Sequence, residues 1–270
     1  MSEYVTIAKS LHARAGYIAE PDMQKASAMA VVPVVINELA HVMQHLPLVF
    51  CMQVSEKEES VPVIMALQSL EAGVNHLVSF TNRWLFGYQP AFYRRGPFMA
   101  GVTQDGSAML SIEKSRFVEE AGEGCVALFD DTGELSPQVQ QVVRFLNELL
   151  KAERETKGAV AQLYSAGVLE PWDLSNDPVL QEYQAKEGVP KGLLRVNLDR
   201  INRLDDAQIA SLQRSGALFV ATMQHASIAR LKGMVTLAQA YEKARGQQSA
   251  AQEPENIDQM FGEGNDTFSF

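Results

Sequence analysis

The chain has 270 residues, a length that suits one large domain or two small ones. Hydrophobic residues make up 46% and charged residues 21%, a balance that excludes an intrinsically disordered or fibrous protein. The formal net charge of -10 excludes nucleic acid as the main partner, because non-specific affinity for phosphate backbones comes from Lys and Arg. We therefore expect a globular protein with a substantial core.

Two further features bear on the compartment. Cys51 and Cys125 lie in apolar sequence contexts, which favours buried thiols in a reducing environment over a disulfide framework. The first residues do not form a basic region followed by an apolar one, and no run reaches the roughly 18 apolar residues of a membrane helix. These patterns predict a cytoplasmic protein that does not insert into a membrane.

Residues 1–30 are mildly polar and carry no strong pattern. The β-branched run 31–37 predicts a strand whose proline requires an edge position, and a short helix with Asn37 as its N-cap then ends before Pro47. Two apolar runs, 48–54 and 61–70, flank a charged loop and predict an antiparallel hairpin. A further short strand is expected near residues 75–80.

A second hairpin and a long helix follow. The runs 98–104 and 108–114 flank Asp105 and Gly106, a typical hairpin turn. Another apolar run ends in a turn at 130–133. Ser136 then provides an N-cap for a helix with apolar residues at helical spacing, which continues, or breaks and restarts, until Gly167.

The last hundred residues are mainly helical. A short apolar stretch at 168–174 precedes the polar segment 175–191, which is the best internal boundary, and a strand is expected at 192–199. Helices are predicted from Asp205 to Gly216 and then over 217–245. Strands in the first half and helices in the second indicate an α+β fold, with antiparallel hairpins packed against a helical half.

We expect a single α+β domain over residues 1–245 and an acidic, flexible tail over 246–270. The tail has five carboxylates and no Lys or Arg. Its mixture of acidic and aromatic residues could form a short motif that docks on a partner or on the body.

The stretch 83–98, called here the aromatic segment, is the most unusual part of the chain. Six aromatic residues alternate with arginines, and two glycines and two prolines interrupt it. Arginine on aromatic faces makes cation–π contacts, and such residues are enriched in binding sites. The candidate ligand-binding residues are Arg83, Trp84, Tyr88, Phe92, Tyr93, Arg94 and Arg95. The alternative is that the aromatics are core residues and the arginines pair with carboxylates.

Glu38, His41 and His45 form the sharpest candidate for chemistry. They lie at i, i+3 and i+7, so a helix would bring them to one side, where they could ligate a divalent metal. Capping, core hydrogen bonding or exposure are the alternatives. The chain has no G-x-S-x-G, Walker, G-x-G-x-x-G or C-x-x-C motif, and we expect no other cofactor.

Several blocks in order carry a family resemblance: V-P-V-V-I-N-E-L-A-H-V-M-Q-H-L-P-L-V-F at 32–50, P-A-F-Y-R-R-G-P-F at 90–98, C-V-A-L-F-D-D-T-G-E-L-S at 125–136 and R-S-G-A-L-F-V-A-T-M-Q-H-A-S-I-A-R-L at 214–231. With these blocks the chain resembles the SapC family of bacterial proteins. Gly96 stands where the family usually has an aromatic residue.

The resemblance implies an accessory role beside surface-layer proteins, or in uptake systems with TonB-dependent receptors and halogenase-like proteins. It supplies no catalytic residue. We therefore expect a non-enzymatic protein that binds a peptide or partner protein at the aromatic segment. The alternative is a metal-dependent enzyme that uses Glu38, His41 and His45.

Overall fold

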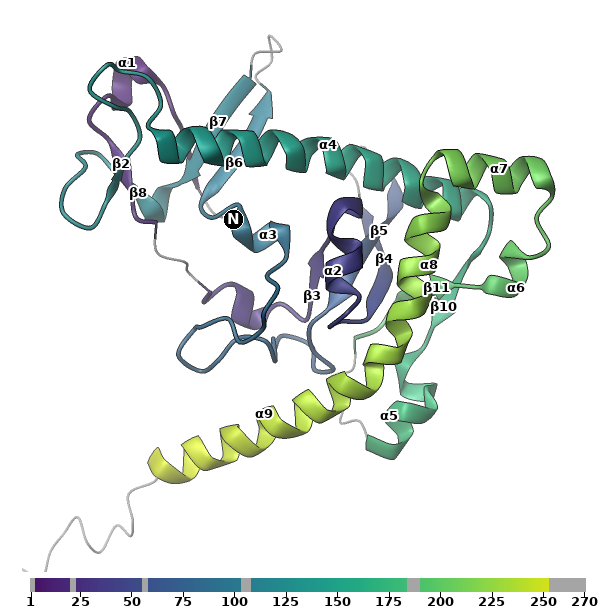
Figure 1. Cartoon of the computed structure of the whole chain (residues 1–270). Coiled ribbons are helices and arrows are strands. Elements are labelled where there is room, and N and C mark those ends of the chain that lie inside the picture. Colours follow the sequence, from purple (N-terminus) through teal and green to yellow (C-terminus); the bar gives the residue numbers. More distant parts are fainter. Residues whose placement is uncertain (1–2, 20–22, 55–57, 103–107, 184–189, 253–270) are drawn as a thin grey trace, which may run out of the picture.

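Antiparallel strands dominate the first half of the chain and helices the second, which confirms the predicted α+β class (Figure 1). The computed structural model describes residues 3–19, 23–54, 58–102, 108–183 and 190–252. The described strands form three sheets, with orders β1-β7-β6, β10-β11-β4-β5-β3 and β8-β2-β9.

The five-stranded sheet is the centre of the molecule. Its strands, in sheet order, are β10 (Leu169–Trp172), β11 (Leu193–Val196), β4 (Leu48–Val54), β5 (Ser60–Leu67) and β3 (Val31–Pro33). The predicted hairpin is confirmed, because β4 and β5 pair antiparallel from Leu48 opposite Ala66 to Val54 opposite Ser60. Pro33 and Pro171 lie in the two edge strands, where a missing ladder donor is tolerated.

The strand expected over 31–37 ends early, at Pro33. A 3-10 turn at Ile36–Glu38 follows and leads into α2 (Leu39–Val42). The prediction of Asn37 as the helix N-cap is wrong: Glu38 occupies that position, and its side chain accepts a hydrogen bond from the Val35 amide at 3.1 Å. The strand expected near 75–80 is also absent, and only an isolated bridge joins Val78 to Trp84 there.

The two smaller sheets bring the N-terminus against the middle of the chain. Their strands are β1 (Tyr4–Thr6), β6 (Phe98–Val102) and β7 (Ala108–Glu113) in one sheet, and β2 (Gly16–Tyr17), β8 (Phe117–Val118) and β9 (Val126–Ala127) in the other. The β6–β7 pairing confirms the second predicted hairpin, although its turn at Asp105 and Gly106 lies outside the described residues. A one-turn helix, α1 (Lys9–His12), lies between β1 and β2.

The long helix α4 (Pro137–Ser165) crosses the whole molecule without a break (Figure 1). Ser136 caps it, as predicted, by accepting a hydrogen bond from the Val139 amide. Val139 and Leu146 pack into the core of the small sheets, whereas Val160 and Leu163 pack into the core of the five-stranded sheet. One helix therefore belongs to both cores.

The remaining helices follow in the last third of the chain. They are α5 (Pro178–Tyr183), α6 (Leu198–Ile201), α7 (Asp206–Arg214), α8 (Ala217–Ser227) and α9 (Leu231–Gln252). Of these, α8 packs against β4 and β11 of the five-stranded sheet. The helix predicted over 217–245 is interrupted by a 3-10 turn at Ile228–Arg230 and reaches beyond Arg245. The first residues expected in the tail are thus helical, and residues 253–270 lie outside the described part.

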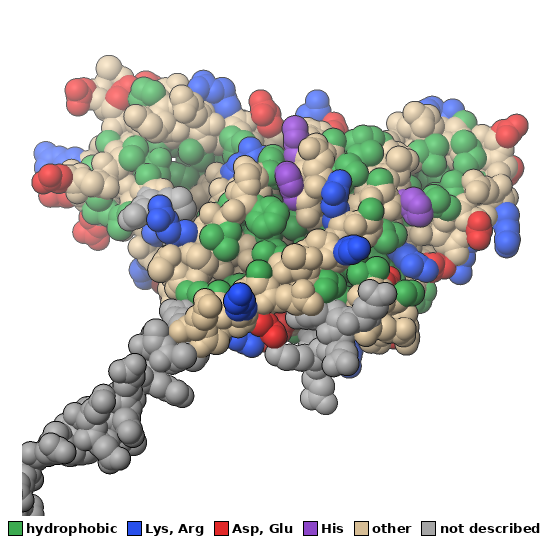
Figure 2. Space-filling view, turned by 60° about the horizontal axis from the view of Figure 1, so that its bottom comes forward, with side chains coloured by type: hydrophobic (Ala, Val, Ile, Leu, Met, Phe, Trp, Pro, Cys, Tyr) green, Lys and Arg blue, Asp and Glu red, His purple; other side chains and the backbone are tan. Residues whose placement is uncertain are grey.

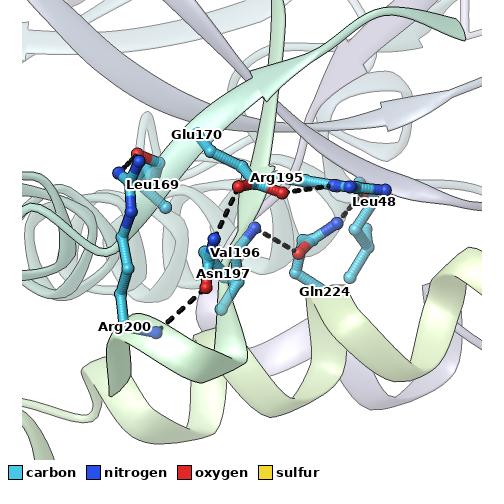
Figure 3. A network of polar contacts seen from close by, with 8 residues as sticks. All are labelled: Leu48, Leu169, Glu170, Arg195, Val196, Asn197, Arg200 and Gln224. Atoms are coloured by element: carbon cyan, nitrogen blue, oxygen red, sulfur yellow. Dashed lines mark hydrogen bonds and ion pairs between the residues drawn. The ribbon is translucent and has the colours of Figure 1, made fainter. Parts of the chain in front are cut away.

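A polar network fixes the β10–β11 edge of the sheet to the helices (Figure 3). Buried Gln224 of α8 accepts a hydrogen bond from the Val196 amide at 2.9 Å and donates one to the Leu48 carbonyl at 3.0 Å. Glu170 accepts hydrogen bonds from Arg195 and Asn197 across the same edge. The block 214–231 therefore contains, besides its apolar residues, the buried Gln224, whose hydrogen bonds join α8 to two strands of the sheet.

Among the helices of the described residues, none has both the length and the apolar character needed to cross a bilayer.

Candidate binding site

The aromatic segment lies around the short helix α3 (Ala91–Arg94), between the five-stranded sheet and the small sheets (Figure 1). Pro90 directly precedes α3, and the fixed φ of proline is compatible with the start of a helix. Gly96 follows α3 with a φ of +62°, a left-handed conformation that favours glycine. The segment is irregular, as its glycines and prolines predict.

Glu38 forms the structural centre of this region. Its side chain is buried, and Oε1 accepts the hydrogen bond from the Val35 amide. Oε2 accepts hydrogen bonds from the Ala91 amide at 2.7 Å and from the Tyr88 hydroxyl at 2.9 Å. The carboxylate thus joins the start of α2 to the start of α3, two segments more than 50 residues apart in sequence.

Arg94 completes the cluster around Glu38. Its Nη2 donates to the Tyr88 hydroxyl at 3.0 Å and lies 3.8 Å from Glu38 Oε2. The guanidinium also lies over the rings of Tyr88 and Phe145, each 5.3 Å from the ring centroid. Burial, reinforced by the Glu38 carboxylate, raises the pKa of Tyr88 to about 12, so the phenol stays protonated and keeps donating. Glu38, Tyr88 and Arg94 are called here the brace.

The other aromatic residues of the segment divide between core and pocket. Trp84 and Tyr93 pack against buried clusters, and the Tyr93 hydroxyl donates to Gln68 at 2.8 Å. The Trp84 indole nitrogen is buried and has no hydrogen-bond partner among the residues that the structure describes. Arg83 is exposed and lines neither pocket described below.

A pocket of about 470 Å³, called here the arginine pocket, opens beside α3. Four of the predicted residues line it: Phe92, Tyr93, Arg94 and Arg95. Its other lining residues were not predicted from the sequence, and they include Met23, Lys25, Met29, Glu113 and Arg116. Those residues come from the patternless N-terminus, from the end of β7 and from the 3-10 turn Lys114–Arg116 that follows it, and no local motif marks them.

Charge distinguishes the arginine pocket from the rest of this acidic chain. Lys25, Arg94, Arg95 and Arg116 line it, and Glu113, paired with Lys25, is the one carboxylate among its described lining residues. Arg95 lies over the Phe92 ring, with 4.5 Å between its guanidinium carbon and the ring centroid. Arg95 and Arg116 form no ion pair within the described residues.

Hydrophobic side chains also gather across the middle of one face of the molecule, with Lys and Arg set among them (Figure 2). Leu85, in the aromatic segment, is 55% exposed.

The predicted metal ligands do not converge in this structure. Glu38 is used by the brace, the His41 ring stacks on Tyr88, and the His45 ring meets Phe86 edge-on. Across the described residues, no group of three or more His, Cys, Asp and Glu side chains is arranged to hold a metal ion. Core hydrogen bonding, one of the sequence alternatives, describes the role of Glu38.

Two other titratable residues lie inside the fold. His76 is buried against the Tyr241 ring of α9, and this burial lowers its pKa below the ordinary histidine value. Cys51 and Cys125 are free, but they are half-buried where the sequence suggested full burial. Burial raises the pKa of the Cys51 thiol to about 11, which makes it a poor nucleophile.

Comparisons with known proteins agree with the resemblance seen in the sequence. Neither the curated proteins nor the solved structures gave a match. The sequence model of the SapC family matches residues 7–234, which include the brace and most residues of both cores and of the arginine pocket. The chain therefore belongs to the SapC family.

Proposed function

We propose that this SapC-family protein is a non-enzymatic binding protein whose arginine pocket takes an acidic segment of a partner protein or peptide. The observation that carries the proposal is the excess of cations at this pocket in a chain of net charge -10. Arg95 and Arg116 have no carboxylate partner within the described residues, so their charges can meet those of a ligand.

The apolar part of the pocket suits a peptide. Met23 and Met29 lie beside Tyr93, and methionine side chains adapt their shape to different apolar neighbours. Phe92 holds the Arg95 guanidinium, which reduces the side-chain entropy that binding would cost. Acidic residues flanked by an apolar side chain match this combination of cations, methionines and aromatic rings.

The partner is proposed to come from a surface-layer or uptake system. This part of the proposal rests on the family resemblance, which associates such proteins with surface layers, TonB-dependent receptors and halogenase-like proteins. A pull-down of the native protein from its own cell extract would identify the natural partner.

Fluorescence anisotropy with a labelled Asp- and Glu-rich peptide tests the proposal. The control peptide has Asn and Gln in place of the acids. We expect the acidic peptide to bind about tenfold more tightly, because charge-assisted hydrogen bonds are worth roughly 1.5–3 kcal/mol. Adding salt should weaken this binding, since exposed charges are screened.

The matched variants are Arg95→Gln and Arg154→Gln, the second removing an exposed arginine of α4 outside the pocket. Only Arg95→Gln should weaken peptide binding, again by about tenfold. The proposed binding needs no metal, so chelation with EDTA should leave it unchanged. Equal binding of the two peptides, or equal effects of the two variants, would refute the proposal.

A further inference from the structure

A second cavity of about 180 Å³, called here the apolar cavity, lies between the five-stranded sheet, α4 and α3. Phe92 and Arg95 line it as well as the arginine pocket, so their stack forms a shared wall. The other lining residues come from β3 to β5 and from α4: Pro33, Val34, Val35, Gln53, Pro62, Val63, Ile64, Leu149, Glu153, Thr156, Lys157 and Val160.

Regular secondary structure holds the walls of the apolar cavity in place. Its α4 residues recur at helical spacing from Leu149 to Val160, so one face of the helix forms one wall. Ile64 of β5 and Val160 are almost fully buried in the main core. The cavity is thus built into the packed sheet and helix, and its shape is largely pre-formed.

Polar groups are confined to a few positions of the lining. The Thr156 hydroxyl donates to the Ala152 carbonyl at 2.6 Å and accepts from the Ile36 amide at 2.8 Å, so its hydrogen bonds are already made. Of the remaining polar groups, Arg95 and Lys157 carry positive charges and Glu153 a negative one. Neither cation forms an ion pair within the described residues, and the lining has one net positive charge.

Size and charge together specify the ligand. An apolar cavity of about 150 Å³ accommodates benzene, so this cavity fits one six-membered ring or a short aliphatic chain. A carboxylate is costly to bury without partners, and it would therefore remain beside Arg95 and Lys157. We infer that the apolar cavity binds a small monocarboxylic acid whose body is about the size of one aromatic ring.

Isothermal titration calorimetry with phenylacetate and its neutral analogue phenylacetamide tests this inference, because the two share one apolar body. We expect phenylacetate to bind about tenfold more tightly, owing to the charged hydrogen bonds. Lys157→Gln should reduce that preference severalfold. Val63→Phe, at a half-buried position of the lining, should fill the cavity and abolish binding of both compounds.

Lys157 and Val63 line only the apolar cavity, so both variants should retain acidic-peptide binding at the arginine pocket. The two proposals can therefore fail separately. Equal affinity for phenylacetate and phenylacetamide would overturn the inference, as would unchanged phenylacetate binding by folded Val63→Phe. If Val63→Phe does not fold, an unchanged preference in Lys157→Gln is the overturning result.

Discussion

The brace and the Phe92–Arg95 stack lie next to each other, yet they use the same residue types in opposite ways. Arg94 of the brace contacts a buried carboxylate and two rings, all of which belong to the fold. Arg95 contacts one ring and lines both pockets, whereas Arg94 lines the arginine pocket alone. Adjacent arginines thus have different roles because only one of them has an internal carboxylate partner.

The sequence allowed two interpretations of the aromatic segment, as a binding site or as part of the core, and each fits a different part of the segment. The brace, with Trp84, fits the interpretation as core, whereas Phe92 and Arg95 line the two pockets at which we propose binding. Removing Trp84 or Arg94 would therefore disturb packing and would be a poor test of binding. The comparison predicts that variants on the two sides will separate stability from affinity.

The largest effect is expected for Glu38→Ala. This change leaves the Val35 and Ala91 amides and the Tyr88 hydroxyl without their acceptor. Unmet hydrogen bonds of this kind destabilise by about 1–3 kcal/mol each, and we expect a total loss of about 3 kcal/mol or more. Urea denaturation measures it, with Glu153→Ala as the α4 control. A loss below about 1 kcal/mol would show that Glu38 does not hold the segment.

A smaller effect should distinguish Arg94→Gln from Arg95→Gln. The first variant loses the contacts with Tyr88 and Glu38. Because the Arg94 side chain is itself partly exposed to solvent, we expect a stability loss of about 1 kcal/mol. The second loses one cation–π contact, worth about 0.5 kcal/mol, but weakens peptide binding. Denaturation and anisotropy on both variants test the separation, and the reverse pattern would contradict it.

The most modest effect concerns pH and the loop that supports the brace. Leu77 accepts a backbone hydrogen bond from Leu85, and its neighbour His76 is buried. Burial lowers the pKa of His76, and Arg245 adds to this, while Glu71 and Glu242 oppose it. At a pH between the lowered pKa and the ordinary value of 6.5, the unfolded chain binds more protons than the folded chain does. The free energy of unfolding should therefore fall as the pH drops below 6.5.

Thermal unfolding at a series of pH values, compared between the native protein and His76→Asn, measures this dependence. The variant should show a flatter decline below pH 6.5, because it has no histidine to protonate at that position. Identical slopes in the two proteins would mean that His76 does not resist protonation in the folded state.

Elements with a local cause were predictable from the sequence. Ser136 and Pro137 mark the start of α4, Asp205 caps α7, and the charged loop between two apolar runs specifies the β4–β5 hairpin. Where a contact with a distant or neighbouring side chain determines the backbone conformation, the local sequence pattern gave the wrong secondary structure. The run 31–37 is mostly β-branched, but the Glu38 carboxylate accepts a hydrogen bond from the Val35 amide and a 3-10 turn forms at Ile36–Glu38.

The candidate site depended even more on long-range contacts. Arg94 and Arg95 were visible as an arginine pair among aromatics, but nothing near them in sequence indicates that Glu38 would take one of them. Lys25 and Arg116 reach the arginine pocket from strands and loops that pair across 80 residues or more. A pocket assembled from such separate segments has no periodic or motif signature.

The unbroken course of α4 has a consequence for how the molecule can be divided. A helix of 29 residues spans roughly 43 Å, and it supplies side chains to both cores along that length. Cutting the chain within α4 would strip each sheet of part of its cover. The helix α4 also forms a wall of the apolar cavity. If a ligand in that cavity shifted the axis of α4, the shift would also move the α4 side chains that pack on the small sheets.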